Sequence, residues 1–243
     1  MNITRRQMLL LLPAAAVSWK YVLAGTPEMA PNYTQTDHWW GMLLDITKCI
    51  GCGNCVRACK TENSVPDGYF RTWVERYHVN DFHIESPEVD SPEGGINGFP
   101  QSTESGGKNF FVPKMCNHCV DSPCTQVCPV GATFDSRDGV VLIDEKYCLG
   151  CRYCIQACPY GCRYFHPEKR IADKCTLCYH RITRGLVTAC CENCPTGARQ
   201  LVDLKNPADP IHEFLKTHSV QVLKPHLATG AKVYYNELDG SVR

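Results

Sequence analysis

The sequence lacks an excess of charge of either sign. Its 243 residues include 25 basic and 25 acidic side chains, so the formal net charge is zero at pH 7. No tract of lysine or arginine interrupts this balance. Because nucleic-acid binding requires a basic surface, we expect no nucleic acid among the partners.

Sequence signatures of catalysis are also missing. The chain contains no glycine-rich nucleotide loop, no serine–histidine–aspartate set and no flavin signature. Its 9 histidines are scattered. His118 and His180 lie in or beside cysteine-rich segments, where we expect hydrogen bonding or packing rather than metal ligation. These absences predict that the chain is not an enzyme by itself.

A hydrophobic run long enough to cross a membrane is absent. The apolar run at residues 8–17 follows Arg5-Arg6 and is shorter than the roughly 20 residues that a spanning helix needs. Paired arginines before a short apolar run are typical of a twin-arginine export signal, a route that moves folded proteins. We interpret residues 1–27 as this signal or as a retained anchor, and we expect the protein at the periplasmic face of the membrane. Whether the signal is cleaved stays open.

Cysteine is the residue that the sequence has in abundance, and 16 of its 18 cysteines form four blocks. In chain order the blocks are Cys49, Cys52, Cys55 and Cys59; Cys116, Cys119, Cys124 and Cys128; Cys148, Cys151, Cys154 and Cys158; and Cys175, Cys178, Cys190 and Cys194. Blocks 1 and 3 have the spacing C-x2-C-x2-C-x3-C. Blocks 2, 3 and 4 end in Cys-Pro, whereas Lys60 follows block 1.

The spacing favours [4Fe–4S] clusters. Three cysteines close together, followed by a Cys-Pro, are typical of bacterial ferredoxins. Structural zinc sites usually consist of two separated Cys-x-x-Cys pairs. Disulfides between such close cysteines are redox-labile and do not join distant segments. A secreted structural protein stabilised by zinc or disulfides is the alternative interpretation.

Internal repeats pair the four blocks. Residues 44–52 resemble residues 143–151, and residues 128–132 resemble residues 194–198. In two-cluster ferredoxins the fourth cysteine of each run ligates the other cluster. We therefore expect blocks 2 and 3 to exchange their last cysteines, and blocks 1 and 4 to do the same.

This exchange predicts four sets of four thiolates, each set named after the block that supplies three of them, and hence four [4Fe–4S] clusters. The sets are Cys49, Cys52, Cys55 and Cys194 (set 1); Cys116, Cys119, Cys124 and Cys158 (set 2); Cys148, Cys151, Cys154 and Cys128 (set 3); and Cys175, Cys178, Cys190 and Cys59 (set 4). Two cysteines lie outside the sets. We interpret Cys162 as a small buried packing residue, and the role of Cys191 stays open.

Outside the blocks, hydrophobic patterns predict a few regular elements. Residues 81–108 are rich in Ser, Pro, Gly and Asp and predict a long surface loop. We predict strands at residues 38–45, 69–77 and 140–143 and a helix at residues 210–217.

Four motifs carry a resemblance to a known family. They are C-N-H-C-V-D-S-P-C-T-Q-V-C-P, C-P-Y-G, K-C-T-L-C-Y-H-R and A-C-C-E-N-C-P-T-G-A. In this order they resemble the four-cluster electron-transfer subunits of DMSO-reductase-type molybdoenzymes and of complexes with an NrfD-like membrane subunit. The match covers about residues 41–202. With its signal, the chain is most similar to the NrfC type, the tetrathionate reductase iron–sulfur subunit and the periplasmic subunit of Dsr-type complexes.

The resemblance implies an α+β fold of two pseudosymmetric ferredoxin-like dicluster units, with long loops, a C-terminal extension and the clusters in a line. Together with the block pairing, it gives five regions. We expect an outer unit at 38–66 plus 170–205, an insertion or loop at 67–109, an inner unit at 110–169 and a capping tail at 206–243, after the signal at 1–27.

The resemblance also implies the partners. The chain would relay single electrons between a quinone-reactive, NrfD-like integral membrane subunit and a molybdopterin catalytic subunit or a multihaem cytochrome c. The terminal substrate, the direction of flow and the cluster potentials are not encoded in these motifs.

Cationic residues lie close to the blocks in sequence. They are Lys48, Arg57, Lys60, Arg152, Arg163, Lys174, Arg181 and Arg184. We expect most of them at the solvated surface. Positive charge beside a cluster would nevertheless raise its reduction potential.

Overall fold

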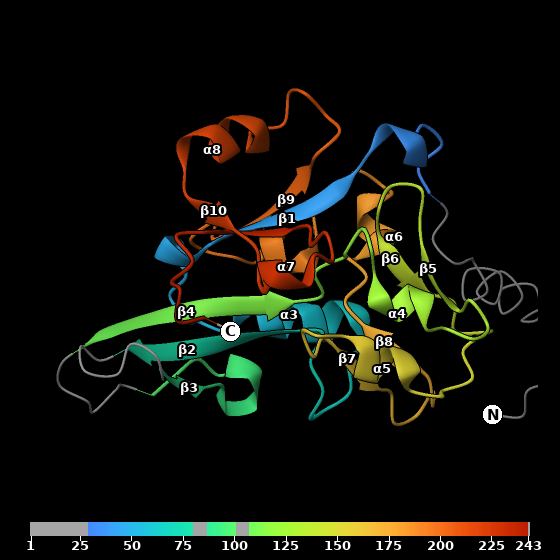
Figure 1. Cartoon of the computed structure of the whole chain (residues 1–243), viewed down its shortest axis with the longest axis horizontal. Helices are drawn as coiled ribbons and strands as arrows, with labels where there is room; N and C mark the ends of the chain where they lie inside the picture. The colour runs from blue at the N-terminus through green and yellow to red at the C-terminus, as the bar shows by residue number, and fades with distance from the viewer. Residues whose placement is uncertain (1–28, 80–86, 101–106, 243) are drawn as a thin grey trace, which may run out of the picture.

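We describe a computed structural model of the chain that covers residues 29–79, 87–100 and 107–242 (Figure 1). The signal or anchor expected at residues 1–27 lies outside these residues. Within the described ranges, no helix is both long enough and apolar enough to cross a membrane.

A four-stranded sheet, ordered β10-β11-β1-β9, joins the beginning and the end of the described chain (Figure 1). Strand β1 (Trp40–Asp45) pairs antiparallel with β9 (Arg199–Asp203) and parallel with β11 (Val233–Asn236). Strand β10 (Val220–Gln221) pairs with β11 at the edge. The predicted strand at 38–45 is confirmed, and the tail that we expected to cap the fold also supplies two strands of this sheet.

Strand β1 is buried on both faces, which explains its continuous apolar run. Met42 and Leu44 face the main core, whereas Leu43 packs with Val202 and with Ile211 of helix α8 (Ile211–Thr217). The predicted helix at 210–217 is thus confirmed, and it covers the outer face of the sheet.

A second sheet, ordered β3-β2-β4, lies on the other side of the core. Its antiparallel strands are β2 (Thr72–Val79), β3 (Glu88–Asp90) and β4 (Lys108–Met115). The strand predicted at 69–77 is confirmed with later bounds. Of the loop predicted at 81–108, residues 81–86 and 101–106 lie outside the described part of the chain. The described remainder is not all loop, because β3 and the 3₁₀ turn η3 (Pro92–Gly95) lie within it.

The cysteine blocks lie in and beside two small hairpins and several helices. The hairpins are β5 (Thr133–Asp135) with β6 (Val141–Ile143), and β7 (Arg163–Phe165) with β8 (Ala172–Lys174). The α-helices are α3 (Asn54–Asn63), α4 (Pro123–Gln126), α5 (Tyr153–Ala157), α6 (Tyr179–Ile182) and α7 (Ala189–Glu192). The remaining 3₁₀ turns are η1 (Gln35–Asp37), η2 (Ile46–Lys48) and η4 (Pro225–Leu227). The fold is α+β, as predicted.

The helix contacts follow the expected pairing of the blocks. Helix α3 of block 1 contacts α7 of block 4, and α4 of block 2 contacts α5 of block 3. The hairpins near α4 and α5 lie together at one end of the molecule, and the two larger sheets lie at the other (Figure 1).

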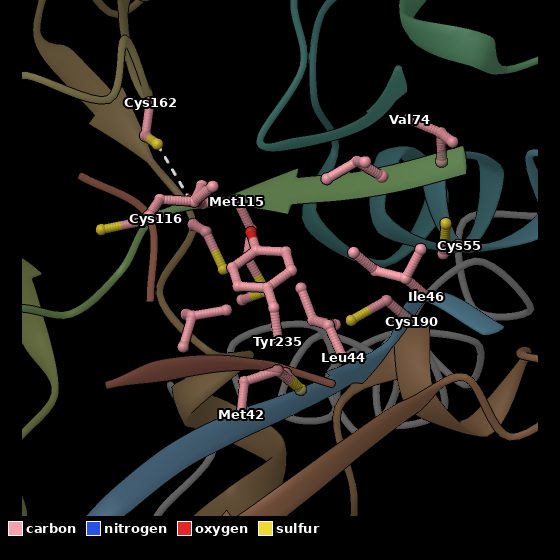
Figure 2. Close-up of a cluster of buried hydrophobic side chains, with 14 of the residues drawn as sticks. Met42, Leu44, Ile46, Cys55, Val74, Met115, Cys116, Cys162, Cys190 and Tyr235 are labelled. Atoms are coloured by element: carbon pink, nitrogen blue, oxygen red, sulfur yellow. Dashed lines mark hydrogen bonds between the residues drawn. The ribbon is translucent and has the colours of Figure 1, made fainter. Parts of the chain in front are cut away.

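The main core fills the space between the two larger sheets (Figure 2). Met42 comes from β1, Tyr235 from β11 and Met115 from β4, and each is at most 1% exposed. Cys55 and Cys190 belong to the same buried cluster. These two thiols are therefore part of the hydrophobic core.

Tyr235 tests how strongly the C-terminal strand stabilises this core. Its side chain is fully buried, and its hydroxyl donates a hydrogen bond to the carbonyl oxygen of Pro113 at 3.1 Å. We expect Tyr235→Ala to lower the free energy of unfolding by about 3–5 kcal/mol through loss of packing. Tyr235→Phe removes only the hydrogen bond and should cost about 1–2 kcal/mol. Thermal unfolding should show a lower unfolding midpoint for Tyr235→Ala than for Tyr235→Phe, and equal midpoints would contradict the prediction.

Candidate iron–sulfur cluster sites

None of the 18 cysteines forms a disulfide in the structure. Zinc is disfavoured by geometry, because a zinc ion holds its ligands at about 2.0–2.3 Å. In the described part of the chain, no three His, Cys, Asp or Glu residues converge closely enough to hold one ion. The thiols of sets 4 and 1 instead line larger cavities.

Two cavities are lined by the thiols of sets 4 and 1. Cys59, Cys175, Cys178 and Cys190 line the first, together with Met42 and Asn63. Cys49, Cys52, Cys55 and Cys194 line the second, beside Arg199. The structure therefore brings together the cysteines of sets 4 and 1, although in each of these sets one cysteine is more than 100 residues away from the other three in sequence.

The thiols of sets 2 and 3 are also neighbours. Burial raises the pKa of Cys119 to about 11, and the nearby thiols of Cys116, Cys124 and Cys158 add to this effect. In set 3, Cys154 lies near Cys148 and Cys128. Cys151, the remaining member of set 3, is exposed. Iron ligation by these four sets stays a prediction.

Contacts between sets place them in the order 3-2-4-1. Cys124 of set 2 and Cys154 of set 3 share one apolar cluster. Cys116 of set 2 lies near Cys175 of set 4. Cys190 of set 4 lies near Cys55 of set 1. All members of the two middle sets are buried except Cys158, whereas each end set has three members that are half-buried or exposed.

Backbone N–H groups in the Cys-Pro turns favour a thiolate. The N–H of Thr133 donates to Cys128 Sγ at 3.5 Å. Burial raises the pKa of Cys128, but N–H donors including those of Thr133 and Val130 outweigh it, and the net shift is downward. Burial likewise raises the pKa of Cys194, and hydrogen bonds led by the Thr196 hydroxyl reverse the shift. These turns are prepared for anionic sulfur.

Cys158 occupies the third such turn. A hydrogen bond from the Cys162 thiol, with backbone N–H groups of Cys162 and Tyr160, lowers the pKa of Cys158 to about 5 against the opposing effect of burial. Cys162 itself is 3% exposed, and its Sγ also lies 2.9 Å from the Met115 carbonyl oxygen (Figure 2). Its burial agrees with the packing interpretation. Cys191 is half-buried, with its Sγ 3.5 Å from Met42 Sδ.

Block 1 departs from this pattern because Lys60 replaces the proline. Proline cannot continue a helix, and α4, α5 and α7 have ended by the residue before their Cys-Pro. Helix α3 instead continues to Asn63. There the Asn63 amide Nδ2 lies 3.6 Å from Cys59 Sγ and 3.7 Å from Cys178 Sγ. A side-chain amide thus takes the place of the backbone donors of the turn.

Two of the eight cations near the blocks are buried, whereas the other six are exposed or half-buried, as we expected for most of them. Arg163 and Lys174 are 5% and 0% exposed. The ammonium group of Lys174 donates to the carbonyl oxygens of Val141 and Cys175. Sequence reasoning missed two further buried cations, Arg199 and Lys232. Arg199 could have been found, because it stands five residues after Cys194 as Arg163 stands five after Cys158.

Lys232 and His118 lie beside set 2. Burial lowers the pKa of Lys232 to about 8, although nearby Asp135 and the thiol of Cys119 oppose this shift. The ammonium group lies 4.3 Å from the centre of the Trp39 ring. Burial, helped by the positive charge of Lys174, lowers the pKa of His118 well below its ordinary value, so the ring is neutral.

Buried donors without a protein acceptor lie at set 2. The Val141 N–H donates to Nδ1 of His118 at 3.1 Å, so the ring proton is on Nε2. That nitrogen, Nδ2 of Asn117 and Nε of Arg163 are buried, and none has a hydrogen-bond partner in the described structure. Four soft thiols, spare N–H donors and neighbouring cations form an environment that fits an anionic, sulfur-rich cluster.

Comparison with known families identifies the class of these sites. Residues 48–132 and residues 108–204 each match a model described as a 4Fe-4S dicluster domain. The two matches together cover all four cysteine blocks. The chain is therefore a protein with 4Fe-4S dicluster domains, and it holds [4Fe–4S] clusters.

Curated relatives define the family more closely. A tetrathionate reductase subunit of Salmonella typhimurium is 43% identical over 204 residues, which cover 83% of this chain and 74% of the relative. The equivalent tetrathionate reductase subunit of Archaeoglobus fulgidus is 44% identical over 198 residues, 82% of either chain. Protein NrfC of Escherichia coli K12 is 36% identical over 197 residues, covering 80% of this chain and 79% of NrfC.

The chain belongs to this family of iron–sulfur, electron-transfer subunits of respiratory reductases. The family resemblance drawn from the four motifs is thus confirmed, as is the expectation of an electron-transfer subunit.

Gly53 tests the geometry of the block 1 loop. Its φ is +73°, and an added Cβ would lie 2.3 Å from the Gly95 carbonyl oxygen and 2.4 Å from that of Ile96. Gly68 has a similar φ of +77° but open space around it. We expect Gly68→Ala to cost about 1–2 kcal/mol of conformational strain. Gly53→Ala should cost clearly more, because the steric overlap adds to the strain.

Thermal unfolding and iron content of the two glycine variants provide the measurement. Gly53→Ala should lower both the unfolding midpoint and the iron bound per chain, whereas Gly68→Ala should retain its iron. Equal behaviour of the two variants would show that the contact with Gly95 and Ile96 is not needed for block 1.

Proposed function

We propose that the chain relays single electrons through four [4Fe–4S] clusters held by sets 3, 2, 4 and 1, in this order. The observation that carries the proposal is the row of four cysteine sets, in which the two middle sets are buried and the two end sets are more accessible. When bound, each cluster supplies one-electron redox chemistry. The protein positions neighbouring sets, and its core keeps water away from the middle two.

The residues of the sets and around them would hold the clusters and tune their potentials. The thiols hold iron, and the Cys-Pro turns together with Asn63 donate hydrogen bonds to sulfur. Such donors and nearby cations set reduction potentials in iron–sulfur proteins.

Exposed apolar side chains at the ends of the row support contacts with redox partners. Tyr147, Leu149 and Tyr153 of block 3 are 66%, 71% and 59% exposed, next to the exposed thiol of Cys151. At the other end, Ile50 of block 1 is 59% exposed. Apolar groups gathered on a surface commonly mark protein interaction sites.

For the partners, we propose a quinone-reactive, NrfD-like membrane subunit on one side. On the other side we propose a molybdopterin catalytic subunit or a multihaem cytochrome c. The similarity to subunits named for tetrathionate reductase and to NrfC supports this assignment. The paired arginines at Arg5-Arg6 support a periplasmic location.

Iron and acid-labile sulfide per chain test the number of clusters. Four clusters require about 16 iron atoms and as many sulfides, because each cube holds four of each. Anaerobically purified protein should give these values, with interacting EPR signals after reduction. About eight iron atoms would reduce the proposal to two clusters, and zinc without sulfide would refute it.

Cys158 tests the exchange between blocks 2 and 3. We expect Cys158→Ser to damage the cluster of set 2, because the proposal assigns this thiol to Cys116, Cys119 and Cys124. Its EPR spectrum should therefore match that of Cys124→Ser and differ from that of Cys154→Ser. The control is Cys162→Ser, which alters a thiol outside the sets and should retain all clusters. A spectrum like that of Cys154→Ser would mean that each block holds its own cluster.

A further inference from the structure

Two buried arginines occupy equivalent positions in the two halves of the site. Arg163 and Arg199 are each the first residue of the strand that follows a Cys-Pro turn, β7 and β9 respectively. They are 5% and 3% exposed. An arginine is rarely buried to this degree without an anionic partner.

Arg163 lies between sets 2 and 3. One terminal nitrogen is 2.9 Å from Cys124 Sγ in set 2, and the other donates to the Thr133 hydroxyl at 3.3 Å. The guanidinium also lies close to the Cys154 thiol of set 3, and its charge favours the thiolate form of that residue. One side chain therefore lies close to a thiol of each set in the inner pair.

Arg199 lies between sets 4 and 1 in the same way. It lies close to Cys190 of set 4 and to Cys55 of set 1, and its charge favours the thiolate form of both. It also lines the cavity of set 1. One terminal nitrogen donates to the Thr72 hydroxyl at 2.9 Å, so a threonine anchors this guanidinium as Thr133 anchors that of Arg163.

Neither arginine forms an ion pair with a carboxylate in the described part of the chain. The charge partners of both guanidinium groups are therefore thiols. Arginine is always protonated, and its planar fork contacts two groups at once, which the compact ammonium of lysine does not match.

We propose that Arg163 and Arg199 are electrostatic bridges, each of which raises the reduction potentials of both clusters in its own pair. This inference rests on the proposed four-cluster relay. A cluster held by four thiolates is anionic, and reduction adds one more negative charge. A fixed buried cation stabilises the reduced form more than the oxidised form, and the low local dielectric strengthens the effect. Because each guanidinium lies close to thiols of both sets of a pair, the two potentials move together.

Redox titration of the purified protein, followed by EPR, tests the bridges. Arg163→Gln removes the charge but keeps a hydrogen-bond donor. It should lower the equilibrium constants for reduction of the clusters in sets 2 and 3 at least tenfold, which is about 59 mV for one electron. The clusters in sets 4 and 1 should be unchanged. Arg199→Gln should give the converse result, and the double variant should shift all four.

Two further variants separate charge from structure. Arg163→Lys keeps the charge, so the reduction potentials of this variant should stay close to those of the wild type. If Arg163 acted through packing or hydrogen bonding alone, the potentials of the Lys variant would be as low as those of the Gln variant. Arg137→Gln removes the same charge from an exposed position and should leave all potentials in place, because solvent and salt screen it. If one variant fails to incorporate iron, the other arginine provides the same test.

The outcomes distinguish this inference from the proposed function. Wild-type iron content with unchanged potentials in Arg163→Gln and Arg199→Gln would refute the bridges and leave the relay intact. A shift in only one cluster of a pair would also refute them. Wild-type protein with fewer than four clusters would refute the relay itself.

Discussion

The structure depends on placing thiolates inside a hydrophobic core. Burial alone opposes this: it raises the pKa of Cys175 to about 12 and that of Cys49 to about 11. An anionic centre in such a place needs donors and positive charge close by. The Cys-Pro turns, the amide of Asn63 and the buried arginines supply them. The two larger sheets and the hairpins hold these groups in place.

The last thiol of a block receives its hydrogen bonds in the same way in three of the four blocks, and block 1 is the exception. In blocks 2, 3 and 4 the proline ends a short helix, and the following turn offers N–H groups to the last thiol. Block 1 has Lys60 instead, so α3 continues and Asn63 reaches Cys59 from the next turn of the helix. A single residue type therefore decides whether the backbone or a side chain donates to sulfur.

The regular elements could be predicted where the local pattern is strong, as for β1, β2, β6 and α8. Their pairing could not. Strand β11 is parallel to β1 although Met42 and Val233 are nearly 200 residues apart, and no local pattern encodes such a contact. The composition of residues 81–108 likewise predicted a loop, because three residues of β3 on the edge of a sheet carry little signal.

The sequence by itself determined the chemistry of this protein: cysteine spacing specifies soft, four-thiolate sites, and the Cys-Pro repeats indicate which blocks belong together. Only the tertiary structure decided the order 3-2-4-1, the burial of the two middle sets and the position of Arg163 and Arg199, each between the two sets of one pair. The physical reason is that ligand identity is a local property of spacing. The burial of a side chain and the charged groups near it, in contrast, arise only when distant segments pack together. Such packing makes arginine and lysine, which usually lie at the surface, buried partners of the thiols.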